Sequence, residues 1–251
     1  QFTAAASNYV QVLRDNLMIS EFMYHPGGPD PAEAAAGYLE GDFEYIELRN
    51  ISSALTLDLS AARFTKGIDF DFADSAITSL PPGGVVLVVK NAAAFTMRHG
   101  AGKPIAGEWE AGDSLNNGGE ELKLSFGAGD EIHGLEYDDA SPWPVEADLG
   151  GYSLVLVDPS SAPDHAVATN WRSSVLIGGS PGGKDTQTLA EWLAGNGETD
   201  PLADDDRDGF TNAATYAFGH DLHKFAMTSA IHQEPTDFRF LEFTYTRRRA
   251  F

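Results

Sequence analysis

Two neighbouring segments decide the fold class of this chain: Leu17-Met-Ile-Ser-Glu-Phe-Met-Tyr-His-Pro26 and Asp42-Phe-Glu-Tyr-Ile-Glu-Leu-Arg-Asn50. Both are rich in aromatic and branched residues, and a turn signal follows each, so both are predicted to be β-strands. Side chains alternate between the two faces of a strand, and in the second segment each face carries apolar residues as well as a glutamate. Neither face is simply polar, so we expect this strand to lie inside a sheet or a sandwich.

The composition is typical of a soluble globular protein. The chain has 251 residues, enough for one large or two modest domains, and is 42% apolar and 11% aromatic. Its formal net charge is −22, from 38 acidic and 16 basic residues. This negative field repels nucleic-acid backbones and anionic membranes, whereas it attracts cations. We therefore expect no nucleic-acid partner.

Several classes of site and segment are excluded by what the sequence lacks. Cysteine is absent, so a disulfide framework, a thiolate metal site and a cysteine nucleophile are impossible. The longest uninterrupted apolar run, Val85–Val89, is far shorter than a membrane span, and we expect no such span. The chain begins at Gln1 without an initiator methionine or a signal-like opening. We expect it to be a piece of a longer, processed protein.

Short strand-like runs recur along the chain, with turn signals between them. The run Val85–Val89 is apolar on both faces and is predicted to be a central strand. The frequent Gly and Pro turns and the near absence of a long helical period favour an antiparallel β-sandwich. The other predicted strands span residues 54–59, 68–72, 121–125, 131–137 and 152–158, and the third and fourth of these form a predicted hairpin. The predicted core contains Ile46, Leu48, Leu87, Val89, Leu122, Leu154 and Leu156.

Two segments lie outside this strand pattern. Residues 1–16 form a lead-in from a preceding region, and their apolar positions leave a short strand and a helical turn both open. Residues 27–41 form an insertion bounded by Pro and Gly, which is compatible with a helical turn at residues 32–36.

Short motifs follow one another in a definite order along residues 17–184. After I-S-E-F-M-Y-H-P and F-E-Y-I-E-L-R-N come Leu115-Asn-Asn-Gly-Gly-Glu120, Tyr137 with Trp143-Pro144, Gly151-Tyr-Ser-Leu154, Asn170-Trp171 and Gly179-Ser-Pro-Gly182. In this order they resemble the motifs of a bacterial lamin-tail domain. The resemblance implies an immunoglobulin-like sandwich. It also implies a place within a large secreted or cell-surface protein, often beside enzymatic domains, without an active site of its own.

A short predicted helix at residues 188–197 precedes an aspartate-rich loop. Asp204, Asp206 and Asp208 occupy positions 1, 3 and 5 of this loop. Gly209, at position 6, permits the sharp turn that such loops make around Ca²⁺. Three carboxylates so close together repel one another, and a hard cation removes that repulsion. The spacing therefore predicts a calcium site.

The remainder of the loop supplies further oxygen atoms. Phe210 would offer its backbone carbonyl at position 7, and Asn212 lies at position 9. Residues 186–222 resemble the dockerin-like and thrombospondin-type calcium loops of secreted bacterial proteins. The chain departs from that pattern at position 12, where Thr215 replaces the bidentate acid. We expect one weakly bound Ca²⁺, with Thr215 contributing at most a single oxygen.

The end of the chain reads as a lone strand. Residues 237–246 alternate between apolar and polar side chains, and no partner follows them. We expect this strand to be the first of a truncated further β-domain. The predicted organisation is a lead-in at 1–16, the sandwich at 17–184, the helix and calcium loop at 185–225, and a linker with the first strand at 226–251.

The sequence gives little support for a catalytic site or a zinc site. His220 and His223 are the only histidines close in sequence, and two imidazoles without a third ligand make a poor zinc site. Glu44 and Glu47 fall on opposite faces of a strand, so they cannot flank one bond and are expected to hydrogen-bond backbone groups. The chain has no G-x-S-x-G motif and no phosphate-binding loop. We expect no enzymatic activity.

Aromatic and basic residues are further candidates for binding groups. Trp143 and Trp171 could line a sugar-binding face, but large aromatic side chains are mostly buried, so core positions are expected. Residues 247–249 are a short arginine run in a very acidic chain and are expected to flank a strand.

These observations favour a non-catalytic interaction or spacer module of a larger secreted or cell-surface bacterial protein, with a calcium-stabilised joint between domains. The alternative is a carbohydrate-binding accessory module of an extracellular enzyme, and a metal-dependent hydrolase ranks last. The expected partners are calcium, other domains of the same polypeptide, another surface protein or a glycan.

Overall fold

The computed structural model describes residues 4–205, 210–218, 228–233 and 239–244. The chain forms two compact units, Gln1–Asp185 and Thr186–Phe251, which are described separately. Several residues singled out in the sequence lie outside the described residues. They are Asp206, Asp208 and Gly209 of the loop, His220 and His223, and the arginines at 247–249.

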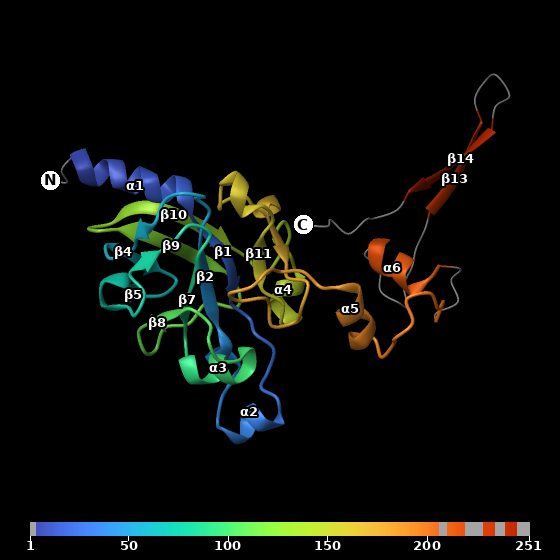
Figure 1. The fold of residues 1–251 in the computed structure, drawn as a ribbon, viewed down its shortest axis with the longest axis horizontal. Coiled ribbons are helices and arrows are strands. Elements are labelled where there is room, and N and C mark those ends of the chain that lie inside the picture. Colours follow the sequence, from blue (N-terminus) through green and yellow to red (C-terminus); the bar gives the residue numbers. More distant parts are fainter. Residues whose placement is uncertain (1–3, 206–209, 219–227, 234–238, 245–251) are drawn as a thin grey trace. The chain divides into compact units, whose positions relative to one another are not determined.

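The first unit is a sandwich of two β-sheets, and the predicted mainly β fold class is confirmed (Figure 1). The larger sheet has the order β12-β11-β1-β2-β7-β8, with strands Trp171–Ser173, Leu154–Leu156, Leu17–Met23, Tyr45–Asn50, Val85–Val89 and Ile105–Glu108. The smaller sheet has the order β10-β9-β4-β5, with strands Asp130–Tyr137, Glu120–Phe126, Ala62–Lys66 and Phe70–Asp71. A separate pair joins β3 (Leu57–Asp58) to β6 (Ser79–Leu80).

The pairing of β1 with β2 assigns the two faces of the larger sheet. The strands are antiparallel, and their register shifts by one residue between Ile19 and Glu21. This bulge brings Ile19 and Phe22 onto the same face, although three residues of regular strand would place them on opposite faces. Beyond the bulge, Glu21 lies opposite Glu47. One face of the sheet is therefore apolar, and the other carries paired carboxylates.

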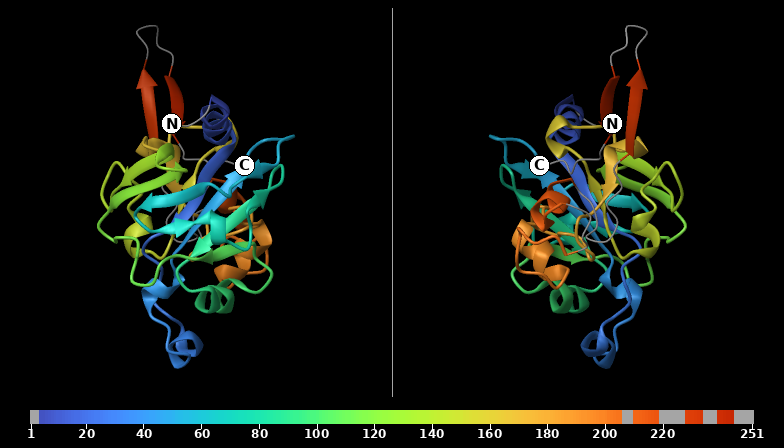
Figure 2. Two further views of the ribbon diagram at one scale, coloured as in Figure 1. Left: turned by 90° about the vertical axis from the view of Figure 1, so that its left-hand side faces the viewer. Right: turned by 90° about the vertical axis from the view of Figure 1, so that its right-hand side faces the viewer.

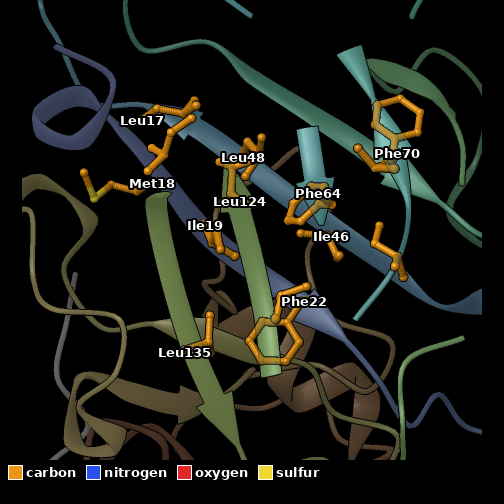
Figure 3. Close-up of a cluster of buried hydrophobic side chains, with 14 of the residues drawn as sticks. Leu17, Met18, Ile19, Phe22, Ile46, Leu48, Phe64, Phe70, Leu124 and Leu135 are labelled. Carbon is orange, nitrogen blue, oxygen red and sulfur yellow. The ribbon is translucent and has the colours of Figure 1, made fainter. Parts of the chain in front are cut away.

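The apolar face packs against the smaller sheet and forms the main core (Figure 3). Phe22 from β1 lies at its centre, with ring centroids 5.2 Å from both Tyr137 and Trp171. Trp143 is 7% and Trp171 is 4% exposed, so both tryptophans are core residues, as the sequence predicts. Figure 3 shows Leu17, Met18, Ile19, Phe22, Ile46 and Leu48 of the larger sheet gathered with Phe64, Phe70, Leu124 and Leu135 of the smaller one.

The opposite face of the larger sheet has a second, smaller core. Helix α3 (Ala92–His99) covers it, and Phe95 packs there against Tyr45. Leu87 and Val89 belong to this second core, so their predicted place between the two sheets is wrong. Side chains alternate along β7, and Val86 and Val88 take the inner positions instead. The remaining predicted core residues, Ile46, Leu48, Leu122, Leu154 and Leu156, do lie in the main core.

One strand pair departs from the antiparallel pattern. Strands β7 and β8 run parallel, and α3 connects them. Asn91 caps the start of α3, since its Oδ1 accepts hydrogen bonds from the N–H groups of Ala93 and Ala94 at 3.1 and 3.0 Å. The connection returns the chain to the same sheet edge while the helix covers the second core.

The lead-in and the insertion both contain helices at opposite ends of the first unit (Figures 1 and 2). Residues 4–16 form helix α1 (Ala4–Asn16), which settles the open choice in favour of a helix. Arg14 of α1 donates from Nε to the backbone carbonyl of Glu131 at 2.8 Å. In the insertion, helix α2 (Pro31–Ala35) is fixed by Arg98, which pairs with Glu33 at 2.7 Å and lies over the Phe43 ring.

Other predicted strands are shorter than expected. In residues 54–59 only Leu57–Asp58 forms a strand, and Leu55 is exposed. In residues 68–72 the strand ends at Asp71, whose side chain caps a 3₁₀ turn by accepting from the Ala73 N–H. The remaining short helical elements are η1 (Glu40–Phe43), η2 (Phe72–Asp74), α4 (Glu146–Leu149), η3 (Pro159–Ser161) and η4 (Ala168–Asn170).

The second unit contains helices α5 (Leu189–Gly195) and α6 (Asn212–Phe218) and strands β13 (Thr228–Gln233) and β14 (Arg239–Thr244). Strands β13 and β14 pair in antiparallel register, with Thr228 opposite Thr244. The predicted lone strand therefore already has a partner on its N-terminal side. The expectation of a lone first strand is wrong, because β13 precedes this strand and pairs with it.

Within the described residues, no helix is both long and apolar enough to cross a membrane.

Replacing Phe22 by alanine should lower the free energy of unfolding by about 3–5 kcal/mol, because the substitution removes a fully buried aromatic ring. The matched control is Leu55→Ala, whose side chain is 46% exposed, and it should change stability by no more than about 0.5 kcal/mol. Urea denaturation monitored by tryptophan fluorescence measures both. Similar midpoints for the two variants would contradict the central position of Phe22.

Candidate functional site

Glu21 lies on the outer face of the larger sheet, surrounded by donors from this chain. Its Oε1 accepts hydrogen bonds from the Tyr45 hydroxyl at 2.6 Å, the Ser153 hydroxyl at 2.6 Å and the Ser180 N–H at 2.8 Å. Its Oε2 accepts from the Ser180 hydroxyl at 3.1 Å. Burial, followed by the neighbouring Glu47 carboxylate, raises the pKa of Glu21 to about 7.

Glu47 is held in a similar way next to Glu21. Its Oε1 accepts from the Ser20 hydroxyl at 2.6 Å and from Arg49 at 3.1 Å, and its Oε2 accepts from the Gly182 N–H at 2.7 Å. Two buried carboxylates in neighbouring positions are a common arrangement in acid–base catalysis. Here the oxygens of both side chains are occupied by groups of the chain itself. The arrangement therefore fastens backbone to the sheet.

The backbone that these carboxylates fasten is residues 176–183, which we call the strap. Besides the bonds from Ser180 and Gly182, the Pro181 carbonyl accepts from Lys103 at 2.8 Å. Gly179 has a φ of +78°, and a Cβ at this position would overlap the Tyr45 hydroxyl and the Glu21 carboxylate. The first glycine of the G-S-P-G motif is thus required where the strap passes close over the buried acids.

Glu44 has a separate environment. Its Oε2 accepts from the Leu115 N–H at 2.8 Å, and its Oε1 lies 3.1 Å from Lys90 Nζ. Burial raises its pKa to about 7. Among the described residues Glu44 and Glu47 share no partner, and each accepts a backbone N–H. Both side chains therefore hydrogen-bond backbone groups, as expected from the sequence.

A pair of histidine rings, tilted by 36° to each other, joins β10 to the loop before β12. The ring centroids of His133 and His165 are 4.1 Å apart, and His165 Nε2 accepts from the Ile19 N–H at 3.1 Å. Burial lowers the pKa of His133 to about 4 and that of His165 to about 3. The two histidines are distant in sequence and no motif connects them, so their contact follows from the fold.

The described part of the aspartate-rich loop wraps around Asn212 at the start of α6. The Asn212 N–H donates to the Ala203 carbonyl at 2.8 Å, and its Nδ2 donates to the Asp200 carbonyl at 2.8 Å. Nδ2 also contacts Asp205 Oδ2 at 2.5 Å. Asn212 is 1% exposed, and its Oδ1 is buried without a hydrogen-bond partner among the described residues.

This amide oxygen fits a hard cation. An unsatisfied buried acceptor costs about 1–3 kcal/mol, and an amide oxygen is a normal ligand for Ca²⁺. Thr215, in contrast, donates from Oγ1 to the Thr211 carbonyl at 3.2 Å, within its own helix. Asp204 and Phe210 lie within the described loop, whereas Asp206 and Asp208 do not. Within the described part of the chain, no cluster of three or more His, Cys, Asp or Glu side chains is arranged to hold a metal ion.

The loop is adjacent to a small helix pair. Trp192 of α5 packs on Tyr216 of α6, with ring centroids 5.7 Å apart and an interplanar angle of 58°. Thr188 and Glu191 form a capping box at the start of α5, which matches the helix start predicted from the sequence. A ligand that orders the start of α6 would therefore also stabilise the position of α5, through the contact of Trp192 with Tyr216.

Comparison with known proteins assigns no family. No family model matches this chain, and neither curated proteins nor solved structures provide a match. The lamin-tail and calcium-loop resemblances rest on the quoted motifs alone.

The histidine pair should make the protein less stable in acid. Unfolding raises both histidine pKa values towards about 6.5, so the unfolded chain binds more protons below that pH. The stability that the pair contributes is present above pH 6.5 and should fall by roughly 2–5 kcal/mol as the pH decreases to about 4. Denaturation midpoints measured between pH 7.5 and pH 4 test this, against the variant His133→Asn/His165→Gln. The difference between the two proteins isolates the pair, because the other shifted groups titrate in both: His99, whose pKa burial lowers to about 4, and Glu21 and Glu44, whose pKa values burial raises to about 7 and whose protonation opposes the histidine effect. An equal pH dependence in the variant would show that the pair does not contribute.

The close approach of the strap predicts a second effect. Gly179→Ala should destabilise the protein by about 1–3 kcal/mol more than Gly37→Ala, because the new methyl group overlaps Tyr45 and Glu21. Gly37 is the matched control, since its φ is +88° and no atom lies within 4 Å of a Cβ there. Both substitutions share the cost of positive φ, so their difference in unfolding free energy isolates the overlap. Equal values would show that the strap is not held closely against the sheet.

Proposed function

We propose that this chain is a non-catalytic interaction or spacer module of a larger secreted or cell-surface bacterial protein. The sandwich would be an immunoglobulin-like lamin-tail domain, and a calcium loop would stiffen the segment after it. The observation that carries the calcium part is the buried Oδ1 of Asn212, which has no hydrogen-bond partner among the described residues. The hydrogen bonding of Glu21 and Glu47 to the strap supports the non-catalytic part, because these buried acids serve the fold.

The proposed ligands are oxygen atoms from a single loop. Asp204, Asp206 and Asp208 supply carboxylates, Phe210 supplies its carbonyl, and Asn212 supplies its amide oxygen. The bond from Asn212 Nδ2 to the Asp200 carbonyl orients the amide, so that the other end of the same group is the acceptor. A cation beside Oδ1 would remove the cost of burying that acceptor alone.

Calcium suits this loop better than magnesium. Ca²⁺ accepts six to eight oxygens in a flexible geometry, whereas Mg²⁺ requires a tight octahedron and keeps its waters. Thr215 lacks the bidentate carboxylate of position 12, and its hydroxyl is bonded within the helix. We expect a Kd on the order of 10⁻⁴–10⁻³ M, which is sufficient outside a cell.

Binding would act on the helix pair of the second unit. The loop ends at the start of α6, whose Tyr216 packs on Trp192 of α5. Ordering the loop would fix the first turn of α6 and, through this ring contact, hold α5. The proposed role of Ca²⁺ is therefore to reduce the flexibility of the segment that follows the sandwich.

Isothermal titration calorimetry with CaCl₂ tests the site. The wild type should give a saturable heat, which the double variant Asp206→Ala/Asp208→Ala should lose, since the remaining ligands include a single carboxylate. The control Asp130→Ala/Glu136→Ala removes two exposed acids elsewhere and should keep the heat. MgCl₂ should give a much smaller response.

Two results would reject the calcium site. One is an equal heat in the wild type and in Asp206→Ala/Asp208→Ala, and the other is no heat in the wild type at millimolar Ca²⁺. Near-ultraviolet circular dichroism provides a second readout, because Ca²⁺ should change the signal of the Trp192 and Tyr216 pair in the wild type alone.

A further inference from the structure

Helix α4 presents two aliphatic side chains to solvent. Val145, just before the helix, and Leu149, at its end, are four residues apart and lie on the same side of the helical turn. Val145 is 52% exposed and Leu149 is 84% exposed, whereas Ala147 between them is fully buried. The helix therefore packs through one side and directs an apolar side outward.

Helix α4, which carries these exposed side chains, is held in place by contacts with the rest of the first unit. Glu146 accepts a hydrogen bond from the Ser173 hydroxyl of β12 at 3.1 Å. Asp148 lies 2.8 Å from Nδ1 of His25, which follows β1. Together with the buried alanine, these contacts fix α4 on the first unit. The position of the helix therefore keeps Val145 and Leu149 exposed to solvent.

A third aliphatic side chain comes from the strap. Ile177 is 68% exposed, and its Cγ2 lies 3.4 Å from the place that a Cβ on Gly151 would take. The Gly178 N–H also donates to the Gly151 carbonyl at 2.7 Å. Gly151 follows Leu149 by two residues, which brings the strap beside α4. We call Val145, Leu149 and Ile177 the α4 surface.

Acidic side chains accompany the α4 surface. Burial raises the pKa of Tyr24, and the carboxylates of Asp148, Asp139 and Asp138 raise it further, so three negative charges gather around one hydroxyl. Glu146 adds a fourth acid on the helix itself. Residues 124–171 contain nine Asp or Glu and no Lys or Arg. The stretch itself contains no lysine or arginine to neutralise these acids, and Lys123, just before it, pairs with Glu131 at 2.8 Å.

Charge decides which partner fits. A second copy of this chain would bring the same acids and a net charge of −22, and nucleic acids and anionic lipids carry the same sign. A basic protein segment has the opposite sign. Aliphatic side chains on such a segment could bury the α4 surface while its Lys or Arg side chains meet the acids around it.

We propose that the α4 surface binds a basic segment of another protein, in which Lys or Arg side chains flank exposed aliphatic residues. This inference rests on the proposed role as an interaction module, and it names the chemistry of the partner. Apolar burial supplies the affinity, while the acids accelerate encounter and select against acidic partners.

A fluorescently labelled synthetic amphipathic peptide of Lys and Leu is the probe, and anisotropy measures its Kd. The variant Leu149→Ser/Ile177→Ser should weaken binding by about tenfold or more, because two exposed aliphatic side chains lose their burial. The matched control is Leu55→Ser/Met97→Ser, in which both side chains are 46% exposed, and binding should change by less than about twofold. The charge variant Asp138→Asn/Asp139→Asn should weaken binding and reduce its dependence on salt.

Three outcomes would overturn the proposal. Equal binding by the two serine double variants, or equal binding of a peptide with Ser in place of Leu, would show that the acidic field acts alone. A wild-type dimer in sedimentation that Leu149→Ser/Ile177→Ser disperses would make a second copy the occupant. No peptide binding by a wild type that gives its normal calcium heat would reject this surface while leaving the calcium site intact.

Discussion

The pairing of β1 with β2 across a one-residue bulge is the constraint on which the first unit depends. The bulge brings Ile19 and Phe22 into one core and leaves Glu21 beside Glu47 on the other face. A buried pair of acids would oppose folding without compensation. The backbone N–H groups of Ser180 and Gly182 compensate by donating hydrogen bonds to Glu21 and Glu47. The bulge therefore buries these acids only because the strap supplies their donors.

Sequence patterns predicted the strands best where packing and local preference agree. Val85–Val89 was assigned correctly because β-branched residues and two buried faces point to the same structure. The pattern does not show which face of β7 meets which core, so the predicted core positions of Leu87 and Val89 are wrong. Only the neighbours across the sheet decide which core each face meets. Strand β13 lies outside the predicted strands because its residues, Thr228–Gln233, show no clear alternation of apolar and polar side chains.

The candidate site was partly visible in the sequence. Spacing alone identified Asn212 as a possible ligand, but its orphaned oxygen follows from tertiary hydrogen bonds to Asp200 and Ala203. The carboxylate pair of Glu21 and Glu47 and the ring pair of His133 and His165 depend on contacts between distant strands. Motif spacing predicts contacts between residues that are close in sequence. It does not predict contacts between residues on distant strands.

The position of β1 also has a consequence for synthesis. In the finished sheet it lies between β2 and β11, and the Glu21 carboxylate meets a residue 159 positions later, Ser180. During translation β2 is synthesised soon after β1, whereas β11 and the strap are synthesised near the end of the first unit. Until then one edge of β1 has no partner, and such edges promote association between nascent chains. Long-range closure of this kind is slow, so the first unit completes its folding only when nearly all of it has left the ribosome.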